Sequence, residues 1–199
     1  MIQIQMKKDM KIKSRMFSAV ITTVAIVAFL AGCKKDKDKV DVPQPVQNEA
    51  EVITTMKLKF VDSSNSSIIN YATFRDPDGD GGLGVDIFDT IKLAPNKTWI
   101  TTIILLNETV SPADTISNEV LDEGVDHLIC FSPTGASASV VKTDLDANSL
   151  AIGLQSKWKT TATGSGTMQI ELRHQPGTKN GSCTLGDTDI DVVFKTKIQ

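Results

Sequence analysis

Three aspartates alternate with other residues in an acidic segment, a spacing that could bind a metal ion. The carboxylates of Asp76, Asp78 and Asp80 are followed by a glycine at the sixth position, Gly81, as in the first half of an EF-hand calcium loop. The second half differs, because the twelfth position requires a bidentate glutamate and is occupied by Ile87. The alternative is a solvated acidic turn, since Asp, Gly and Pro are common turn residues. We favour the turn and keep a Ca²⁺ site as the alternative hypothesis.

A second acidic loop repeats this pattern in a shorter form. Asp144, Asp146 and Asn148 again place oxygen donors at alternating positions between two expected strands. Carboxylate and amide oxygens are the ligands that Ca²⁺ prefers. If both loops bind Ca²⁺, the ions would stabilise the ends of the folded domain rather than catalyse a reaction.

The sequence contains two histidines, His127 and His174, and each has acidic residues close by in the chain. Histidine changes its charge near neutral pH, so either one could act as the general base of a hydrolase or as a haem ligand. No second histidine stands at metal-ligand spacing, and the GxSxG, HExxH and P-loop patterns are absent. The sequence therefore favours two structural histidines and a protein that is not an enzyme.

The N-terminal segment predicts export. Five basic residues within positions 7–15 precede an uncharged run from Met16 to Ala31, which is shorter than the roughly 20 residues that a membrane-spanning helix needs. The tetrapeptide LAGC that ends at Cys33 resembles the lipobox of bacterial lipoproteins. The resemblance implies cleavage before Cys33, a diacylglycerol on its thiol, and a fatty acid such as palmitate on the new amine. We expect a signal peptide over residues 1–32 and attachment to the membrane through the lipid.

Two further cysteines, Cys130 and Cys183, remain after cleavage. Disulfides persist in the oxidising compartments that exported proteins reach, so these two thiols could pair. Alternatively, Cys130 is a buried apolar residue in the run LICF, and Cys183 is a loop thiol. The sequence does not place their Cα atoms within the roughly 7 Å that a disulfide needs, so both possibilities stay open.

Composition limits the size and the partners of the mature protein. Removal of residues 1–32 leaves 167 of the 199 residues, an ordinary size for one domain. The mature chain carries 16 Lys/Arg and 23 Asp/Glu, and this net charge of −7 argues against nucleic acid as a partner. Residues 33–50 lack apolar periodicity and predict a flexible tether. Residues 51–199 have the pattern of a folded domain.

Apolar and polar residues alternate with a period of two along much of residues 51–199. Met56, Leu58 and Phe60 alternate with lysines, and the same pattern recurs from Ile190 to Ile198. A period of two predicts strands with one buried face. Further strand-like segments are 68–74, 90–93, 99–106, 125–131, 139–142, 152–158 and 167–173.

Only one segment predicts a helix, from about Asp114 to Glu123. Ile116 and Val120 share one of its faces, Asp114 or Thr115 could cap its start, and Gly124 would end it. Eight or nine strands with one short helix favour an all-β fold, an antiparallel immunoglobulin-like β-sandwich. The expected core anchors are Trp99, Trp158 and Phe194.

Five segments lie in order along the chain: EAEVITTMKLKF from Glu49, RDPDGDGG from Arg75, NETVSPADTISNEVLDEGVDH from Asn107, LRHQPG from Leu172 and LGDTDIDVVF from Leu185. Together they resemble a family of Bacteroidetes-type outer-membrane lipoproteins. The resemblance implies one domain attached to the outer membrane of the cell envelope, facing the periplasm or the medium. Some members are labelled type 1 periplasmic binding fold superfamily proteins, which implies alternating helices and strands. The single helical segment found here favours the β-sandwich instead.

These observations lead us to expect a non-enzymatic binding or accessory module of the cell envelope. Its loops could recognise a ligand, and by analogy it would work beside a TonB-dependent uptake system with an outer-membrane transporter as partner. The first alternative is a Ca²⁺-stabilised structural envelope domain. The second is a haem-binding protein or hydrolase that uses His127 or His174.

Overall fold

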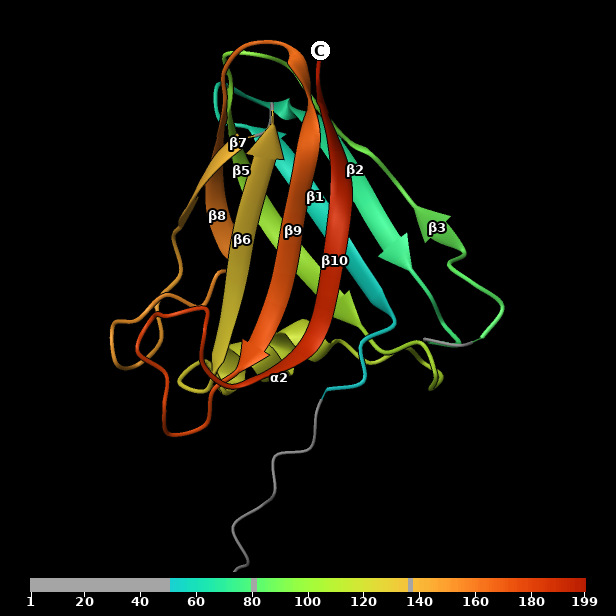
Figure 1. The fold of residues 1–199 in the computed structure, drawn as a ribbon, viewed down its shortest axis with the longest axis vertical. Coiled ribbons are helices and arrows are strands. Elements are labelled where there is room, and N and C mark those ends of the chain that lie inside the picture. The colour runs from blue at the N-terminus through green and yellow to red at the C-terminus, as the bar shows by residue number, and fades with distance from the viewer. Residues whose placement is uncertain (1–50, 80–81, 136–137) are drawn as a thin grey trace, which may run out of the picture. The chain divides into compact units, whose positions relative to one another are not determined.

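The computed structural model of the chain describes residues 51–79, 82–135 and 138–199 (Figure 1). The expected signal peptide, the lipidation site Cys33 and the tether lie outside the described residues, and so does Asp80 of the first acidic loop. Among the described residues, no helix has the length and hydrophobicity that crossing a bilayer requires.

The described residues form two β-sheets that pack face to face, and the expectation of an all-β sandwich is confirmed. The first sheet contains, in spatial order, β3 (Ile87–Phe88), β2 (Asn65–Arg75), β1 (Thr55–Asp62), β5 (Thr98–Leu106), β8 (Gln155–Thr160) and β7 (Ala138–Lys142). The second contains β4 (Ile91–Leu93), β10 (Asp187–Ile198), β9 (Gly164–His174) and β6 (His127–Gly135). Figure 1 shows β6, β9 and β10 in front of β1, β5 and β8.

Side-chain alternation builds the core between the sheets. Met56, Leu58 and Phe60 of β1 are buried while the lysines between them are half-buried, as a period of two requires. On β10, Val192 and Phe194 are buried in the same way. The expected anchors Trp99, Trp158 and Phe194 all lie in this core. Trp158 packs in T-shaped arrangements with Phe60 and Phe131, at ring-centroid distances of 5.1 and 5.7 Å.

The strand count and one strand direction differ from the sequence-based expectation. The described residues form ten strands rather than eight or nine, because β3 has only two residues and is too short to give a periodic pattern. β4 pairs in parallel with β10, so the second sheet is mixed rather than purely antiparallel. The strand expected at 152–158 is β8, which begins later because Ile152 and Leu154 lie in the preceding connection.

The helix α2 (Ile116–Asp122) covers one end of the sandwich, where β6 begins and β9 ends (Figure 1). Ile116 and Val120 are buried, as their spacing predicts. Thr115 is the N-cap residue, but its side chain makes no capping hydrogen bond, and Asp114 instead accepts a hydrogen bond from the Thr115 N–H. The helix therefore depends on its buried face rather than on a side-chain cap.

Cys130 and Cys183 form a disulfide, with their Cα atoms 5.9 Å apart. Cys130 is a buried residue of β6, and Cys183 lies in the loop between β9 and β10. Of the two possibilities that the sequence left open, the structure contains the disulfide. The bond ties this loop to the second sheet, close to the helix end of the sandwich.

Candidate functional site

The two histidines meet at the helix end of the sandwich. His127 is the first residue of β6 and His174 the last of β9, and the antiparallel register of these strands places them directly opposite each other. Their rings stack with centroids 4.9 Å apart and planes inclined by 18°. Both side chains are buried, His127 with only 1% exposed. The sequence alone does not show that the two histidines meet, since strand register is set by tertiary pairing.

The two ring nitrogens of His127 have different surroundings. Nδ1 lies 3.2 Å from the backbone oxygen of Glu123, which can only accept a hydrogen bond, so the neutral ring carries its proton on Nδ1. Nε2 makes no hydrogen bond within the described residues. It lies 3.9 Å from Oδ2 of Asp189, too far for a hydrogen bond. Burial lowers the pKa of His127, and this leaves Nε2 as a buried lone pair at neutral pH.

A bulge in β10 turns Asp189 toward this histidine. The register of β10 against β9 shifts between Thr188 and Ile190, so Asp189 is an extra residue that no residue of β9 faces. Its side chain is 1% exposed, and neither oxygen makes a hydrogen bond of normal geometry within the described residues. Burial raises the pKa of Asp189, while His174, His127 and the backbone N–H of Glu51 lower it by less.

Two glutamates complete what we call the histidine–carboxylate cluster (His127, His174, Asp189, Glu51 and Glu123). A carboxylate oxygen of Glu51, a carboxylate oxygen of Glu123 and a ring nitrogen of His127 lie within 4.8 Å of one another. Burial, with a smaller contribution from the negative charges of Glu119, Asp189, Glu123 and Asp114, raises the pKa of Glu51 to about 7. This end of the sandwich thus gathers acidic groups that repel one another, and a cation would relieve that repulsion.

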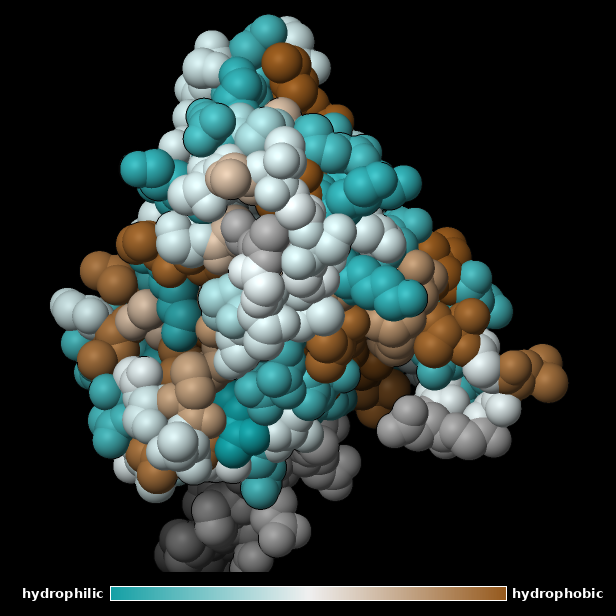
Figure 2. All heavy atoms as spheres, turned by 45° about the horizontal axis from the view of Figure 1, so that its top comes forward, coloured by the Kyte–Doolittle hydropathy of each residue, from teal (hydrophilic) through white to brown (hydrophobic). Residues whose placement is uncertain are grey.

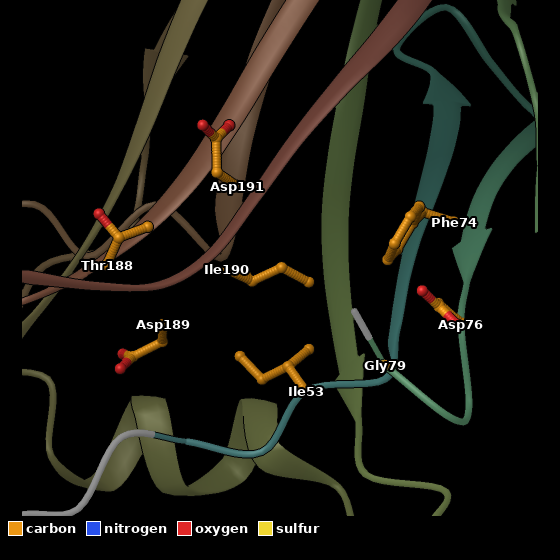
Figure 3. Close-up of a pocket in the computed structure, with 8 residues that line it drawn as sticks. All are labelled: Ile53, Phe74, Asp76, Gly79, Thr188, Asp189, Ile190 and Asp191. Carbon is orange, nitrogen blue, oxygen red and sulfur yellow. The ribbon is translucent and has the colours of Figure 1, made fainter. Parts of the chain in front are cut away.

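A pocket of about 360 Å³ opens beside the cluster and shares Asp189 with it (Figure 3). Ile53 and Ile190 point toward one another across its centre, Phe74 forms the far wall, and Asp189 lies on the α2 side. The remaining lining residues are Asp76, Gly79, Thr188 and Asp191. Asp191 points away in this view, and Gln169 donates hydrogen bonds to both of its oxygens.

The first acidic loop brings Asp76 and Asp78 together at the edge of this pocket. Asp78 accepts a hydrogen bond of 2.5 Å from the backbone N–H of Leu83. That bond and a hydrogen bond with Asp76 lower the pKa of Asp78, although burial opposes them. Asp76 itself is buried. Because Asp80 lies outside the described residues, a Ca²⁺ site of Asp76, Asp78 and Asp80 stays a prediction.

The second acidic loop uses its carboxylates to hold the backbone. Asp144 accepts hydrogen bonds from the N–H groups of Gly153 and Gln155 at 2.8 and 3.1 Å. Asp146 accepts bonds from the Asn148 and Leu150 N–H groups, and its other oxygen pairs with Lys179 Nζ at 2.7 Å. A Ca²⁺ ion bound by Asp144, Asp146 and Asn148 would have to displace these partners. The geometry therefore favours a structural loop.

The haem and hydrolase hypotheses for His127 and His174 do not gain support from the geometry. Each ring covers one face of the other, and both side chains are buried. A general base or an axial haem ligand must reach its substrate or iron directly. The two rings are instead placed to hold each other and the groups around them.

Exposed apolar side chains occur in β3, in the segment that precedes it, and on β10 at Val193. We call this region the β3 apolar surface; its members are Leu83, Val85, Ile87, Phe88 and Val193. Leu83 is fully exposed, and Phe88 and Val193 line a hollow of about 230 Å³ with Lys195. Figure 2 shows apolar atoms on the side of the molecule where Figure 1 places β3. This surface could not be predicted from the sequence, because whether an apolar side chain is covered depends on how the sheets pack.

No protein-family model matches the chain, and neither a curated protein nor a solved structure was found to be similar to it.

Proposed function

We propose that this chain is a lipid-anchored cell-envelope protein that acts as a non-enzymatic binding or accessory module and contacts a partner protein through the β3 apolar surface. The observation that carries the proposal is that surface itself. Five apolar side chains at and around the two-residue strand β3 are exposed, and two of them, Phe88 and Val193, line the same hollow. A group of exposed apolar side chains at one sheet edge is typical of protein interaction sites, whereas isolated exposed apolar residues need no explanation.

Two independent features support the envelope location. The LAGC sequence at Cys33 has the pattern of a lipid attachment site. The disulfide between Cys130 and Cys183 is a bond typical of proteins that fold in an oxidising compartment. An outer-membrane transporter of a TonB-dependent system is the partner that we propose, by analogy with other lipid-anchored accessory proteins.

The lipid anchor is tested first, in cells that export the full chain. Replacement of Cys33 by alanine removes the thiol that would carry the diacylglycerol. We expect the wild-type chain to fractionate with membranes and to incorporate labelled palmitate, whereas Cys33→Ala does neither. A Cys33→Ala chain that still incorporates palmitate and remains in the membrane fraction would contradict the proposal.

The partner surface is tested by crosslinking in intact cells followed by affinity purification of the chain. The double variant Leu83→Ser and Val85→Ser removes two exposed side chains, and Val141→Ser is the matched control because Val141 is 64% exposed on β7, away from this surface. We expect the double variant to reduce recovery of an outer-membrane transporter at least tenfold at unchanged melting temperature, and the control to leave it unchanged. Repeated purification of the wild-type chain without any transporter would exclude this partner.

A Ca²⁺-stabilised structural domain is the second candidate, and the observation that favours it is the close approach of Asp76 and Asp78. Two neighbouring carboxylates repel each other unless a proton or a cation lies between them. On this reading, Ca²⁺ raises the melting temperature by several degrees relative to a chelator, and Asp78→Ala removes the difference. An unchanged melting temperature in the wild-type chain would dismiss this candidate.

A further inference from the structure

Three segments that are distant in the sequence bring metal-binding atoms together at the helix end of the sandwich. Glu51 precedes β1, Glu123 follows α2, and His127 begins β6. Their ligand atoms lie within 4.8 Å of one another, a separation that a single ion can bridge after small side-chain rotations. The sequence offers no sign of this group beyond the spacing of Glu123 and His127, since Glu51 arrives only through the fold.

Two buried polar side chains at this cluster, His127 and Asp189, have atoms without partners within the described residues. Nε2 of His127 makes no hydrogen bond within the described residues, and both oxygens of Asp189 lack a bond of normal geometry there. These side chains are each 1% exposed, so bulk solvent does not reach them. A lone pair and a carboxylate that face each other at 3.9 Å, without a proton donor between them, are costly to bury. A positive charge at this position would satisfy both.

We propose that Glu51, Glu123 and His127 bind a divalent transition-metal ion of the Zn²⁺ class, with Asp189 beside the ion. The donor set identifies the class. Imidazole nitrogen together with carboxylate oxygens suits Zn²⁺ and its first-row neighbours, whereas Ca²⁺ and Mg²⁺ take oxygen ligands. This site is distinct from the two aspartate loops and does not depend on the function proposed above.

The surroundings of His127 are those of a positioned metal ligand. Its Nδ1–H donates to the backbone oxygen of Glu123, which fixes the tautomer and directs Nε2 toward Asp189. The stacked ring of His174 holds the plane of the imidazole from the other strand. Glu123 therefore has two roles, since its backbone orients the histidine and its side chain supplies a ligand.

Binding at this site would join three parts of the domain that no strand pairing connects. Glu51 is the first described residue of the folded domain, and the ion would fasten it to the end of α2 and the start of β6. The expected effect is stabilisation of the folded state, because an ion that binds only the folded chain shifts the unfolding equilibrium by mass action.

The test uses full-length protein purified in detergent without a histidine tag, stripped with a chelator and dialysed. Calorimetric titration with Zn²⁺ at pH 7.5 should give one ion per chain, and saturating Zn²⁺ should raise the melting temperature by several degrees. Glu51→Gln should weaken Zn²⁺ binding at least tenfold. The matched control is Glu119→Gln, which removes a neighbouring negative charge but no proposed ligand and should change the affinity by less than threefold.

The second experiment uses His127→Gln and measures the visible absorption of bound Co²⁺, which reports on the ligands of the ion. Co²⁺ bound in place of Zn²⁺ should show visible d–d absorption in the wild-type chain and lose it in His127→Gln. Glu51→Gln keeps the test valid if His127→Gln does not fold, since Glu51 lies outside the strands. Two results would each overturn the proposal. One is an equal Zn²⁺ affinity of the wild-type chain and Glu51→Gln. The other is a wild-type Kd weaker than about 0.1 mM, which corresponds to a binding free energy of about −5.5 kcal/mol; a proton would then be the shared cation.

Discussion

Lys179 and Asp146 form a buried ion pair, with Nζ 2.7 Å from Oδ2 and side chains that are 2% and 1% exposed. Nζ of Lys179 also donates to the backbone oxygen of Gly124 at 2.6 Å. The other oxygen of Asp146 accepts two backbone N–H groups, from Asn148 and Leu150. One lysine thus connects the loop between β9 and β10, the loop between β7 and β8, and the end of α2.

Removal of the lysine charge should destabilise the domain strongly. In Lys179→Met, the carboxylate of Asp146 stays buried without its cation, a situation that costs about 3 kcal/mol or more. We expect urea unfolding to show this loss in the free energy of unfolding. Lys157→Met is the matched control, because Lys157 is exposed on β8 and its replacement should change stability by less than about 0.5 kcal/mol. Equal stability of the two variants would show that the pair contributes nothing.

The same pair predicts how stability changes with pH. Burial by itself would raise the pKa of Asp146, but Lys179 and the N–H groups of Leu150 and Asn148 lower it below its ordinary value of 3.8. A carboxyl group whose pKa is lower in the folded state stabilises that state above the unfolded pKa and loses the contribution as pH falls through the folded pKa.

We therefore expect the free energy of unfolding to decrease as the pH is lowered beneath 3.8. The decrease should be less steep in Asp146→Asn, which has no carboxyl group to protonate at this position. Urea titrations from pH 7 to pH 2 measure both slopes, and the difference between the two chains isolates Asp146 from the other acids. Parallel curves for the two chains over this range would contradict the assignment.

The disulfide should contribute a large part of the stability of the folded domain. Cys130 and Cys183 lie 53 residues apart, and in the chain-entropy model a loop of that length is worth about 4 kcal/mol. The double variant Cys130→Ser and Cys183→Ser should lose most of this stabilisation. A reducing agent should lower the melting temperature of the wild-type chain but not that of the variant. If reduction left the wild-type melting temperature unchanged, the bond would have no stabilising role.

Local patterns were sufficient to predict the sandwich, since the period-two alternation of Met56, Leu58 and Phe60 shows directly in burial. They were insufficient for β3, which has two residues, and for the parallel pairing of β4 with β10, which depends on a partner about a hundred residues away along the chain. The fold class is therefore encoded locally, whereas edge strands and strand direction are decided by tertiary packing.

The histidine–carboxylate cluster required the three-dimensional register. The sequence identifies His127 and His174 as separate candidates, but their stacking follows from the pairing of β6 with β9. Asp189 points inward only because of the bulge in β10, since strict alternation would turn it outward. Glu51 joins them from the start of the domain. A site assembled by a bulge and by distant pairings leaves no motif in the sequence.

Gly186 should be intolerant of a side chain, and its replacement tests how tightly the cluster is held. Its φ of +69° is in the left-handed region, and an added Cβ would meet the backbone oxygen of His174 at 1.9 Å. Gly177 has a similar φ of +64° with nothing within 4 Å, so it separates backbone strain from the steric clash. Gly177→Ala should therefore cost only the backbone strain, about 1 kcal/mol.

Gly186→Ala should cost about 2–4 kcal/mol, because the strand end at His174 must also move. The displaced backbone would disturb the stacking on His127, so the ring resonances of both histidines should shift in NMR spectra of Gly186→Ala and stay unchanged in Gly177→Ala. Similar costs in the two variants with unshifted histidine resonances would mean that the loop gives way without moving β9, and that Gly186 does not support the cluster.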